Sequence, residues 1–179
     1  LVEPGESRVV LTDGRSLAYD QLIIATGTTP RRDQTEGLDS DEYGRTIHDF
    51  YSLEGATALA KVLADWPGGR LVMNIVEMPI KCPVAPLEFM FLADSFFSDR
   101  GMRNQVQLVY VTPLDGAFTK PVAAKHLGTM LERRDIALET DFMVMQVDAE
   151  RKMLVSYDER EIPYDLLVTI PLNMGADYV

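Results

Sequence analysis

Strand-like and helix-like segments alternate through the middle of this sequence. Predominantly apolar runs at residues 71–76 and 106–111 are typical of strands that are buried on both faces. Helical spacing of apolar residues covers 52–63, 87–97 and 122–134, so helices are predicted beside these strands. Parallel strands need long crossovers of this kind, and the order therefore predicts an α/β fold with a parallel sheet.

The alternation of strands and helices stops near the end of the sequence. Residues 136–147, 153–157 and 162–170 are predicted as strands without helices between them, which indicates a β-meander after the α/β part. Two local signals support the helix positions. Ser52 is a favoured N-cap, and Pro86 suits the first turn of the helix that follows it.

One short motif occurs twice. A turn at Asp13-Gly14 is followed by Tyr19-Asp20 and an apolar run at 22–25, which is predicted to be a buried strand. A turn at Asp158-Glu159 is followed in the same way by Tyr164-Asp165 and a second apolar run. The chain therefore contains two ends of one kind of unit, unless the two hairpins match by coincidence.

The strand–helix beginning of such a unit occurs only before the second copy. We expect residues 1–40 to contain the C-terminal strands of an incomplete first domain and a linker, because the sequence over 31–45 is polar. Residues 41–179 are expected to form a complete second domain. The first residue is Leu1, which suggests a piece of a longer protein.

Cys82 is the only cysteine in the chain, and it lies between a predicted strand and a predicted helix. A dinucleotide-binding unit carries a glycine-rich phosphate loop at this junction, but the residues after Val76 include no glycine before the helix. Pro79 and Pro83 also lack the amide donors that a pyrophosphate needs. No acid follows the second strand at Thr112-Pro113, so NAD(P)H is not expected to bind in the usual pose.

The surroundings of Cys82 favour sulfur chemistry. The start of a helix and the neighbouring Lys81 both favour the thiolate, which is the reactive form of cysteine. Pro83 and Pro86 restrict the backbone and would hold the sulfur in one place. The alternative is a buried, unreactive cysteine, the common fate of a lone one.

Charge and composition exclude several functions. A net charge of -11 argues against nucleic-acid partners and against a polybasic membrane patch. One cysteine cannot form an internal disulfide, so a reducing, cytoplasmic environment is the expectation. His48 and His126 have no metal-ligand spacing, and no metal site is predicted.

The segment from Tyr19 to Gly27 resembles the motif that closes the FAD domain of pyridine nucleotide-disulfide oxidoreductases. The resemblance implies Rossmann-like FAD/NAD(P)-binding domains, with Ala25, Thr26 and Gly27 beside FAD. The loop from Lys81 to Pro86 resembles that of sulfide:quinone oxidoreductases and flavocytochrome c sulfide dehydrogenases.

This second resemblance implies that sulfide, or another small sulfur compound, is oxidised at Cys82. Electrons would pass through FAD to quinone or another acceptor, and Glu88 would approach the flavin. Those enzymes use at least two cysteines, so a partner thiol would lie outside this chain. Any membrane association would also come from other parts of the protein, at the membrane periphery.

Two alternatives stay open. The first is an NAD(P)H-dependent FAD oxidoreductase in which Cys82 is only structural. The second is that the chain alone binds no cofactor and is inactive, because it lacks the phosphate loop of the first domain.

Overall fold

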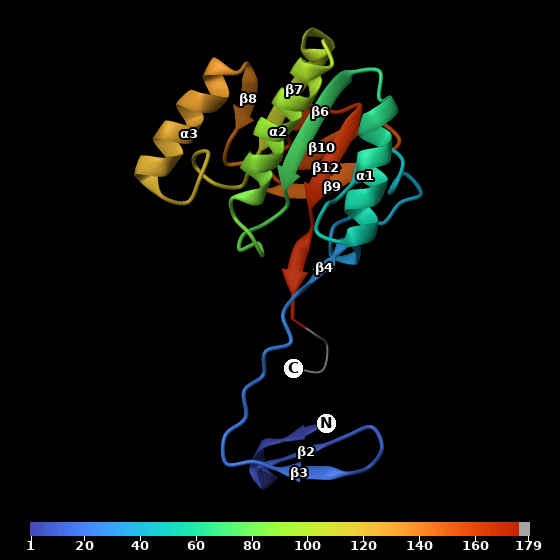
Figure 1. The fold of residues 1–179 in the computed structure, drawn as a ribbon, viewed down its shortest axis with the longest axis vertical. Coiled ribbons are helices and arrows are strands. Elements are labelled where there is room, and N and C mark those ends of the chain that lie inside the picture. Colours follow the sequence, from blue (N-terminus) through green and yellow to red (C-terminus); the bar gives the residue numbers. More distant parts are fainter. Residues whose placement is uncertain (176–179) are drawn as a thin grey trace. The chain divides into compact units, whose positions relative to one another are not determined.

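The computed structural model describes residues 1–175, and the chain divides into two units (Figure 1). The smaller unit contains Leu1–Thr29, and the larger one is Pro30–Asn173. Residues 30–40 were expected to belong to the first segment, but they pack with the larger unit.

The smaller unit is a three-stranded antiparallel sheet. Strands β2 and β3 are joined by the predicted turn, in which Asp13 Oδ1 accepts a hydrogen bond from the Arg15 amide at 3.0 Å. Gly14 has a φ of 85°, which explains the glycine at this position. The elements are β1 (Val2–Glu3), η1 (Pro4–Glu6), β2 (Arg8–Val10) and β3 (Ser16–Ala18).

The larger unit contains the predicted parallel sheet, which has five strands in the order β5-β12-β6-β7-β8. Figure 1 shows the helices of this unit against the sheet. The strands are β5 (Ile47–His48), β6 (Gly69–Ile75), β7 (Val106–Val111), β8 (Ile136–Glu139) and β12 (Leu166–Ile170). The helices are α1 (Leu53–Asp65), α2 (Ala85–Asp99) and α3 (Pro121–Arg133).

A β-meander of three antiparallel strands belongs to the same unit. It consists of β9 (Val144–Asp148), β10 (Met153–Ser156) and β11 (Glu161–Pro163). The remaining elements are the paired strands β4 (Thr29–Arg31) and β13 (Leu172–Met174), and the short helices η2 (Arg32–Gln34) and η3 (Arg103–Gln105).

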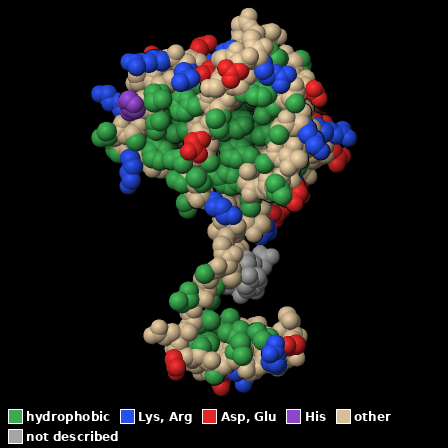
Figure 2. All heavy atoms as spheres, viewed as in Figure 1, with side chains coloured by type: hydrophobic (Ala, Val, Ile, Leu, Met, Phe, Trp, Pro, Cys, Tyr) green, Lys and Arg blue, Asp and Glu red, His purple; other side chains and the backbone are tan. Residues whose placement is uncertain are grey.

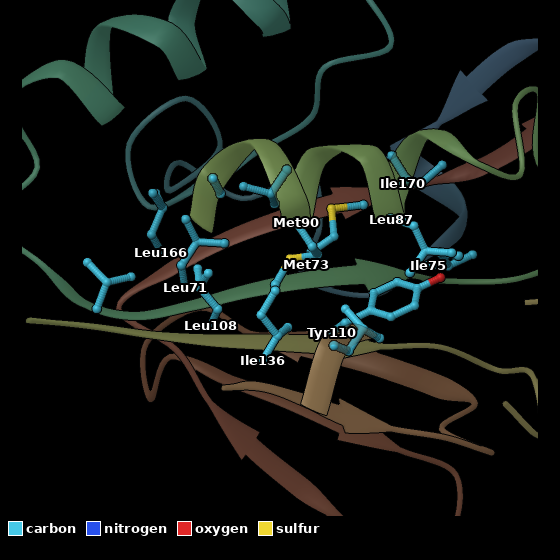
Figure 3. Close-up of a cluster of buried hydrophobic side chains, with 14 of the residues drawn as sticks. Leu71, Met73, Ile75, Leu87, Met90, Leu108, Tyr110, Ile136, Leu166 and Ile170 are labelled. Carbon is cyan, nitrogen blue, oxygen red and sulfur yellow. The ribbon is translucent and has the colours of Figure 1, made fainter. Parts of the chain in front are cut away.

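Strand alternation divides the core into two clusters. Leu71, Met73 and Ile75 of β6 pack against the helices, and Figure 3 shows them with Leu87 and Met90 of α2. The intervening side chains of the sheet pack on the other side against the meander, in the cluster of Val72, Val76, Val109, Leu167, Phe142, Val147 and Leu154. The result is a layer of helices, a parallel sheet and a meander, which confirms the predicted α/β class.

Two predicted strands are divided in the structure. The run at 136–147 is broken between β8 and β9, where Asp141 has a φ of 52° and Phe142 is buried in the core. The run at 162–170 is broken at Tyr164-Asp165. Both breaks carry the chain from one layer to the next, and apolar content alone does not reveal such a change of sheet.

The prediction of a buried strand at 22–25 is wrong for this chain. These residues form no strand, and the side chain of Ile23 is 88% exposed. The matching run of the second copy is β12, which lies between β5 and β6 and pairs with both. The first run has no such neighbours among the described residues, so its apolar side chains stay exposed.

The expectation of a polar linker over 31–45 is also wrong. Leu38 is fully buried in the cluster beside the meander, and the Val147 amide donates to the Glu36 carbonyl at 2.8 Å. Tyr43 donates a hydrogen bond to Asp49, and the Arg32 guanidinium lies 3.8 Å from the centre of the Tyr43 ring. A few apolar and aromatic residues therefore hold a segment whose average composition is polar.

Candidate functional site

The Cys82 loop, residues 76–84, joins β6 to α2 at the carboxyl end of the parallel sheet. Ile80 is buried in the core before the cysteine, and Pro86 is buried after it. Lys81, Cys82 and Pro83 between them are exposed. The loop is thus fixed at both ends and turned outward at the thiol. Ligands of open α/β sheets bind at this edge, so the location suits a functional site.

Cys82 is a free and exposed thiol, so the expectation of burial in the alternative is wrong for this chain. The carbonyl oxygen of Cys82 accepts two hydrogen bonds, from the Tyr51 hydroxyl at 3.0 Å and from the Ala85 amide at 3.2 Å. The second bond closes the turn into α2. The first reaches across 31 positions of the chain to the segment before α1.

Tyr51 stands among aromatic side chains. Its ring meets Phe50 edge-on with centroids 5.4 Å apart, and Phe50 stacks on Phe89 of α2 at 5.2 Å. Burial raises the pKa of Tyr51, while the hydrogen bond to the Cys82 carbonyl acts in the opposite direction. The hydroxyl therefore keeps its proton at neutral pH and stays a hydrogen-bond donor.

Cavities of very different size lie at the two edges of the sheet. A small one, about 120 Å³, adjoins the Cys82 loop and is lined by Glu77, Met78, Pro79, Leu172 and Asn173. A larger hollow, about 720 Å³, lies at the opposite edge, where β6, β7 and β12 begin. We place the candidate site at the Cys82 loop, because the start of parallel strands carries stabilising rather than ligand-binding contacts in most α/β folds.

Glu88, the other predicted site residue of the larger unit, is exposed in the first turn of α2. Its amide donates to the Val84 carbonyl at 3.0 Å, so it belongs to the turn that begins just after Cys82. Figure 2 shows apolar side chains gathered over the face drawn, and exposed ones on or beside α2 include Val84, Leu92 and Phe96. Glu88 therefore contributes an acid beside apolar surface.

Ala25, Thr26 and Gly27 lie in the smaller unit, and all three are exposed. Gly27 has a φ of 71°, which favours glycine, and no atom lies within 4 Å of the place where a Cβ would stand. This bare backbone leaves room for the close approach of a planar ligand. The flavin-binding role that the resemblance implies for these three residues stays a prediction.

The Cys82 loop does not fit a nicotinamide pyrophosphate. Pro79 and Pro83 have no N–H group to donate, and the residues from Glu77 to Val84 include no glycine that would let phosphate approach the backbone. What the loop offers instead is an exposed thiol beside the cationic Lys81.

The sequence analysis missed Tyr51. Asp49 and Ser52 carry a recognisable signal for the start of α1, since Asp49 Oδ1 accepts from the Tyr51 amide at 2.8 Å and the Ser52 hydroxyl caps Gly55. Nothing in the local sequence connects Tyr51 with Cys82, because the contact depends on how α1 and α2 are placed on the sheet.

Residues 1–175 contain no group of three or more His, Cys, Asp or Glu side chains arranged to hold a metal ion. His48 is buried, with Nε2 at 3.1 Å from the Arg45 carbonyl oxygen. Within the same residues, no helix has the length and apolarity needed to cross a membrane.

No protein-family model matches the chain, but individual proteins do. The mitochondrial sulfide:quinone oxidoreductase of Mus musculus is 24% identical over 179 residues, which cover 96% of this chain and 40% of that protein. The ferredoxin–NAD(+) reductase component of the p-cumate 2,3-dioxygenase system of Pseudomonas putida is 34% identical over 113 residues, 61% of this chain and 26% of that one.

Among solved structures, the sulfide:quinone oxidoreductase of Aquifex aeolicus matches 98% of this chain and 42% of its own length, with a TM-score of 0.77 and 20% identity. These likenesses define a class: the chain has the fold of FAD-dependent pyridine nucleotide-disulfide oxidoreductases, and its homologues are enzymes of that kind. Within the class, the mouse homologue is a sulfide:quinone oxidoreductase. The chain spans about 40% of the length of that relative.

Proposed function

We propose that this chain is the central part of a flavoprotein oxidoreductase that oxidises sulfide at Cys82 and passes the electrons through FAD to quinone. The observation that carries the proposal is the exposure of Cys82 at the carboxyl edge of the sheet, on a loop unsuited to pyrophosphate. The similarity to the mouse sulfide:quinone oxidoreductase over 96% of the chain supports it.

The proposed chemistry at Cys82 is the formation of a sulfur–sulfur bond. The Cys82 thiolate and a hydrosulfide ion join as a persulfide, and one proton and two electrons leave. FAD, when bound, supplies the acceptor for this electron pair. Lys81 provides positive charge beside the thiolate and the incoming anion. A second thiol, needed to carry the sulfur onward, would come from outside this chain.

The smaller unit supplies the flavin contact in this proposal. Residues 1–29 would be the closing strands of a first dinucleotide-binding domain, with Ala25, Thr26 and Gly27 against FAD. Residues 30–173 would be a second domain that keeps the dinucleotide fold without the nicotinamide. Delivery of electrons to quinone would bring an otherwise cytoplasmic protein to a membrane surface, through segments outside this chain.

The test is an anaerobic titration of a longer protein that contains this chain and binds FAD. Sulfide is expected to bleach the visible flavin absorbance, whereas NADH is not. Cys82→Ser should slow bleaching by sulfide by about a hundredfold or more, as expected for loss of a nucleophile. Met143→Leu, a change at an exposed residue of another segment, is the control and should behave as the unaltered protein does.

A second function has one specific observation in its favour. The 34% identity to the ferredoxin–NAD(+) reductase component is higher, although over a shorter segment, than the identity to the mouse enzyme. In this alternative the protein is an NAD(P)H-dependent FAD oxidoreductase, and Cys82 is only structural. Bleaching by NADH without sulfide, with equal rates in the Cys82→Ser variant, would establish the alternative and exclude the first proposal.

A further inference from the structure

We propose that Tyr51 is a positioning residue for Cys82: its hydroxyl fixes the Cys82 peptide and thereby the direction in which the thiol projects. This inference rests on the proposed function, to which it adds a residue from a distant part of the chain. The central contact is the 3.0 Å hydrogen bond from the Tyr51 hydroxyl to the Cys82 carbonyl oxygen.

The Cys82 loop needs such a support. Its outermost residues, from Lys81 to Val84, are all exposed and so have little packing of their own. The Ala85 amide bonds the same carbonyl, but it belongs to the turn itself and moves with it. Among the described residues, Tyr51 supplies the hydrogen bond that ties Cys82 to a different element.

Contacts of both its backbone and its ring fix the position of Tyr51. Its amide donates to Asp49 Oδ1 at 2.8 Å, and Asp49 is buried and also accepts from the Ser52 amide at 3.3 Å and from the Tyr43 hydroxyl. The ring rests edge-on against Phe50. Because Tyr51 is fixed at its backbone and at its ring, its hydroxyl approaches the Cys82 carbonyl from one direction. The hydrogen bond therefore holds the Cys82 peptide in one position.

The electrostatic coupling of the two residues supports the same placement. Burial has the largest effect and raises the pKa of Tyr51, the hydrogen bond to the Cys82 carbonyl lowers it, and a negative charge on Cys82 raises it more weakly. The phenol therefore stays protonated when the thiol ionises, and the hydroxyl goes on donating to the loop in the state that reacts. The hydrogen bond from the Tyr51 hydroxyl to the Cys82 carbonyl is therefore kept during the reaction.

The experiment uses the fact that Cys82 is the only cysteine, so a nitroxide spin label attached to it reports on this loop alone. Tyr51→Phe removes the hydroxyl and keeps the ring, and Tyr157→Phe makes the same change at an exposed tyrosine elsewhere. In electron paramagnetic resonance spectra, the mobile fraction of the label should be about fivefold larger in Tyr51→Phe than in the unaltered chain. A factor of about five corresponds to the net free energy of one ordinary hydrogen bond. Tyr157→Phe should leave it unchanged.

Thermal unfolding separates positioning from general stability. The midpoint of Tyr51→Phe should fall by no more than about 4 °C, as expected for one hydrogen bond in a chain of this size. Label mobility equal in the two variants would overturn the proposal. So would a larger fall of the midpoint with label mobility that follows unfolding, because Tyr51 would then have a structural role only.

The catalytic arm uses the longer FAD-containing protein without a label. Tyr51→Phe should lower kcat for sulfide oxidation by about tenfold to a hundredfold, the range for misplaced reacting atoms, with KM little changed. An unchanged kcat would overturn the positioning role. If the unaltered protein does not oxidise sulfide, the proposed function fails, while the label still decides whether Tyr51 orders the Cys82 loop.

Discussion

Gly37 shows how a single position secures the segment that enters the larger unit. Its backbone has a φ of +78°, and a Cβ at this residue would overlap the carbonyl oxygen of Val147. Because this oxygen belongs to the backbone of β9, it cannot rotate away as a side chain could. Gly37→Ala should therefore lower the free energy of unfolding by about 1–3 kcal/mol or more, measured by urea denaturation.

Gly128 provides the matched control for that substitution. It lies inside α3, and no atom stands within 4 Å of its Cβ position. Gly128→Ala should stabilise the chain by up to about 1 kcal/mol, because alanine is the better helix former. Equal effects of the two substitutions would contradict the assigned role of Gly37.

The residues of the candidate site differ in how far the sequence could reveal them. The position of Cys82 in a loop follows from local features: a strand end, two prolines and a helix start. The bond from Tyr51 follows from no local feature, because it joins segments 31 residues apart whose meeting depends on the folded sheet. Local patterns therefore located the loop cysteine, but neither its exposure nor its hydrogen-bonded support.

At the scale of elements, the repeated motif offers a direct comparison. Ile23 follows Tyr19-Asp20 in the first copy and is 88% exposed, whereas Val168 holds the same place in the second copy and is fully buried in β12. Val168→Asp should prevent folding of the larger unit, with a loss above about 4 kcal/mol. Ile23→Asp should change stability by about 0.5 kcal/mol or less. Circular dichroism with urea denaturation measures both.

The same pair tests the domain assignment in a longer protein. If residues 22–25 become a buried strand there, as proposed, Ile23→Asp should be as damaging in that protein as Val168→Asp. A mild effect in the longer protein would show that the first copy never acquires strand neighbours.

The helices and the buried strands β6 and β7 were predictable because their apolar spacing is long and regular. The breaks at Asp141 and Tyr164 were not, because a chain that changes layers keeps its apolar content. Asp165 explains the second break: its amide bonds the Arg70 carbonyl at 2.9 Å, and its Oδ2 accepts from the Arg70 amide at 2.7 Å. The repeated Tyr-Asp pair thus has a structural reason that only the sheet makes visible.

For the whole molecule, pH dependence of stability should involve His48. This side chain is 1% exposed, and burial lowers its pKa below the usual 6.5, against weaker opposite effects of the Arg45 carbonyl and Asp49. As pH falls below about 6.5, the unfolded chain gains a proton that the folded chain does not. The contribution of neutral His48 to the free energy of unfolding is therefore fully present above that pH. Between about pH 6.5 and the lowered pKa of the folded state, it declines by at most about 1.4 kcal/mol per pH unit.

The measurement is the urea midpoint at several pH values between neutral and mildly acidic. His48→Gln keeps a side-chain donor near the Arg45 carbonyl and cannot take up the proton, so its midpoint should fall less over this range. Parallel profiles for the two proteins would show that His48 ionises freely in the folded state.

The layered arrangement was predictable as a whole, but the division into units was not. Composition placed a linker at 31–45, yet Leu38 and Tyr43 commit this segment to the larger unit. A handful of buried side chains outweighs the polar average, because packing energy depends on the individual contacts and not on the mean of a window.

The larger unit begins at β4 and ends at β13, and these two strands are hydrogen-bonded partners. A unit whose first and last strands are adjacent can be inserted into another protein at a single point. Its host would need to open only between two consecutive residues, so changes inside the unit need not alter the protein around it.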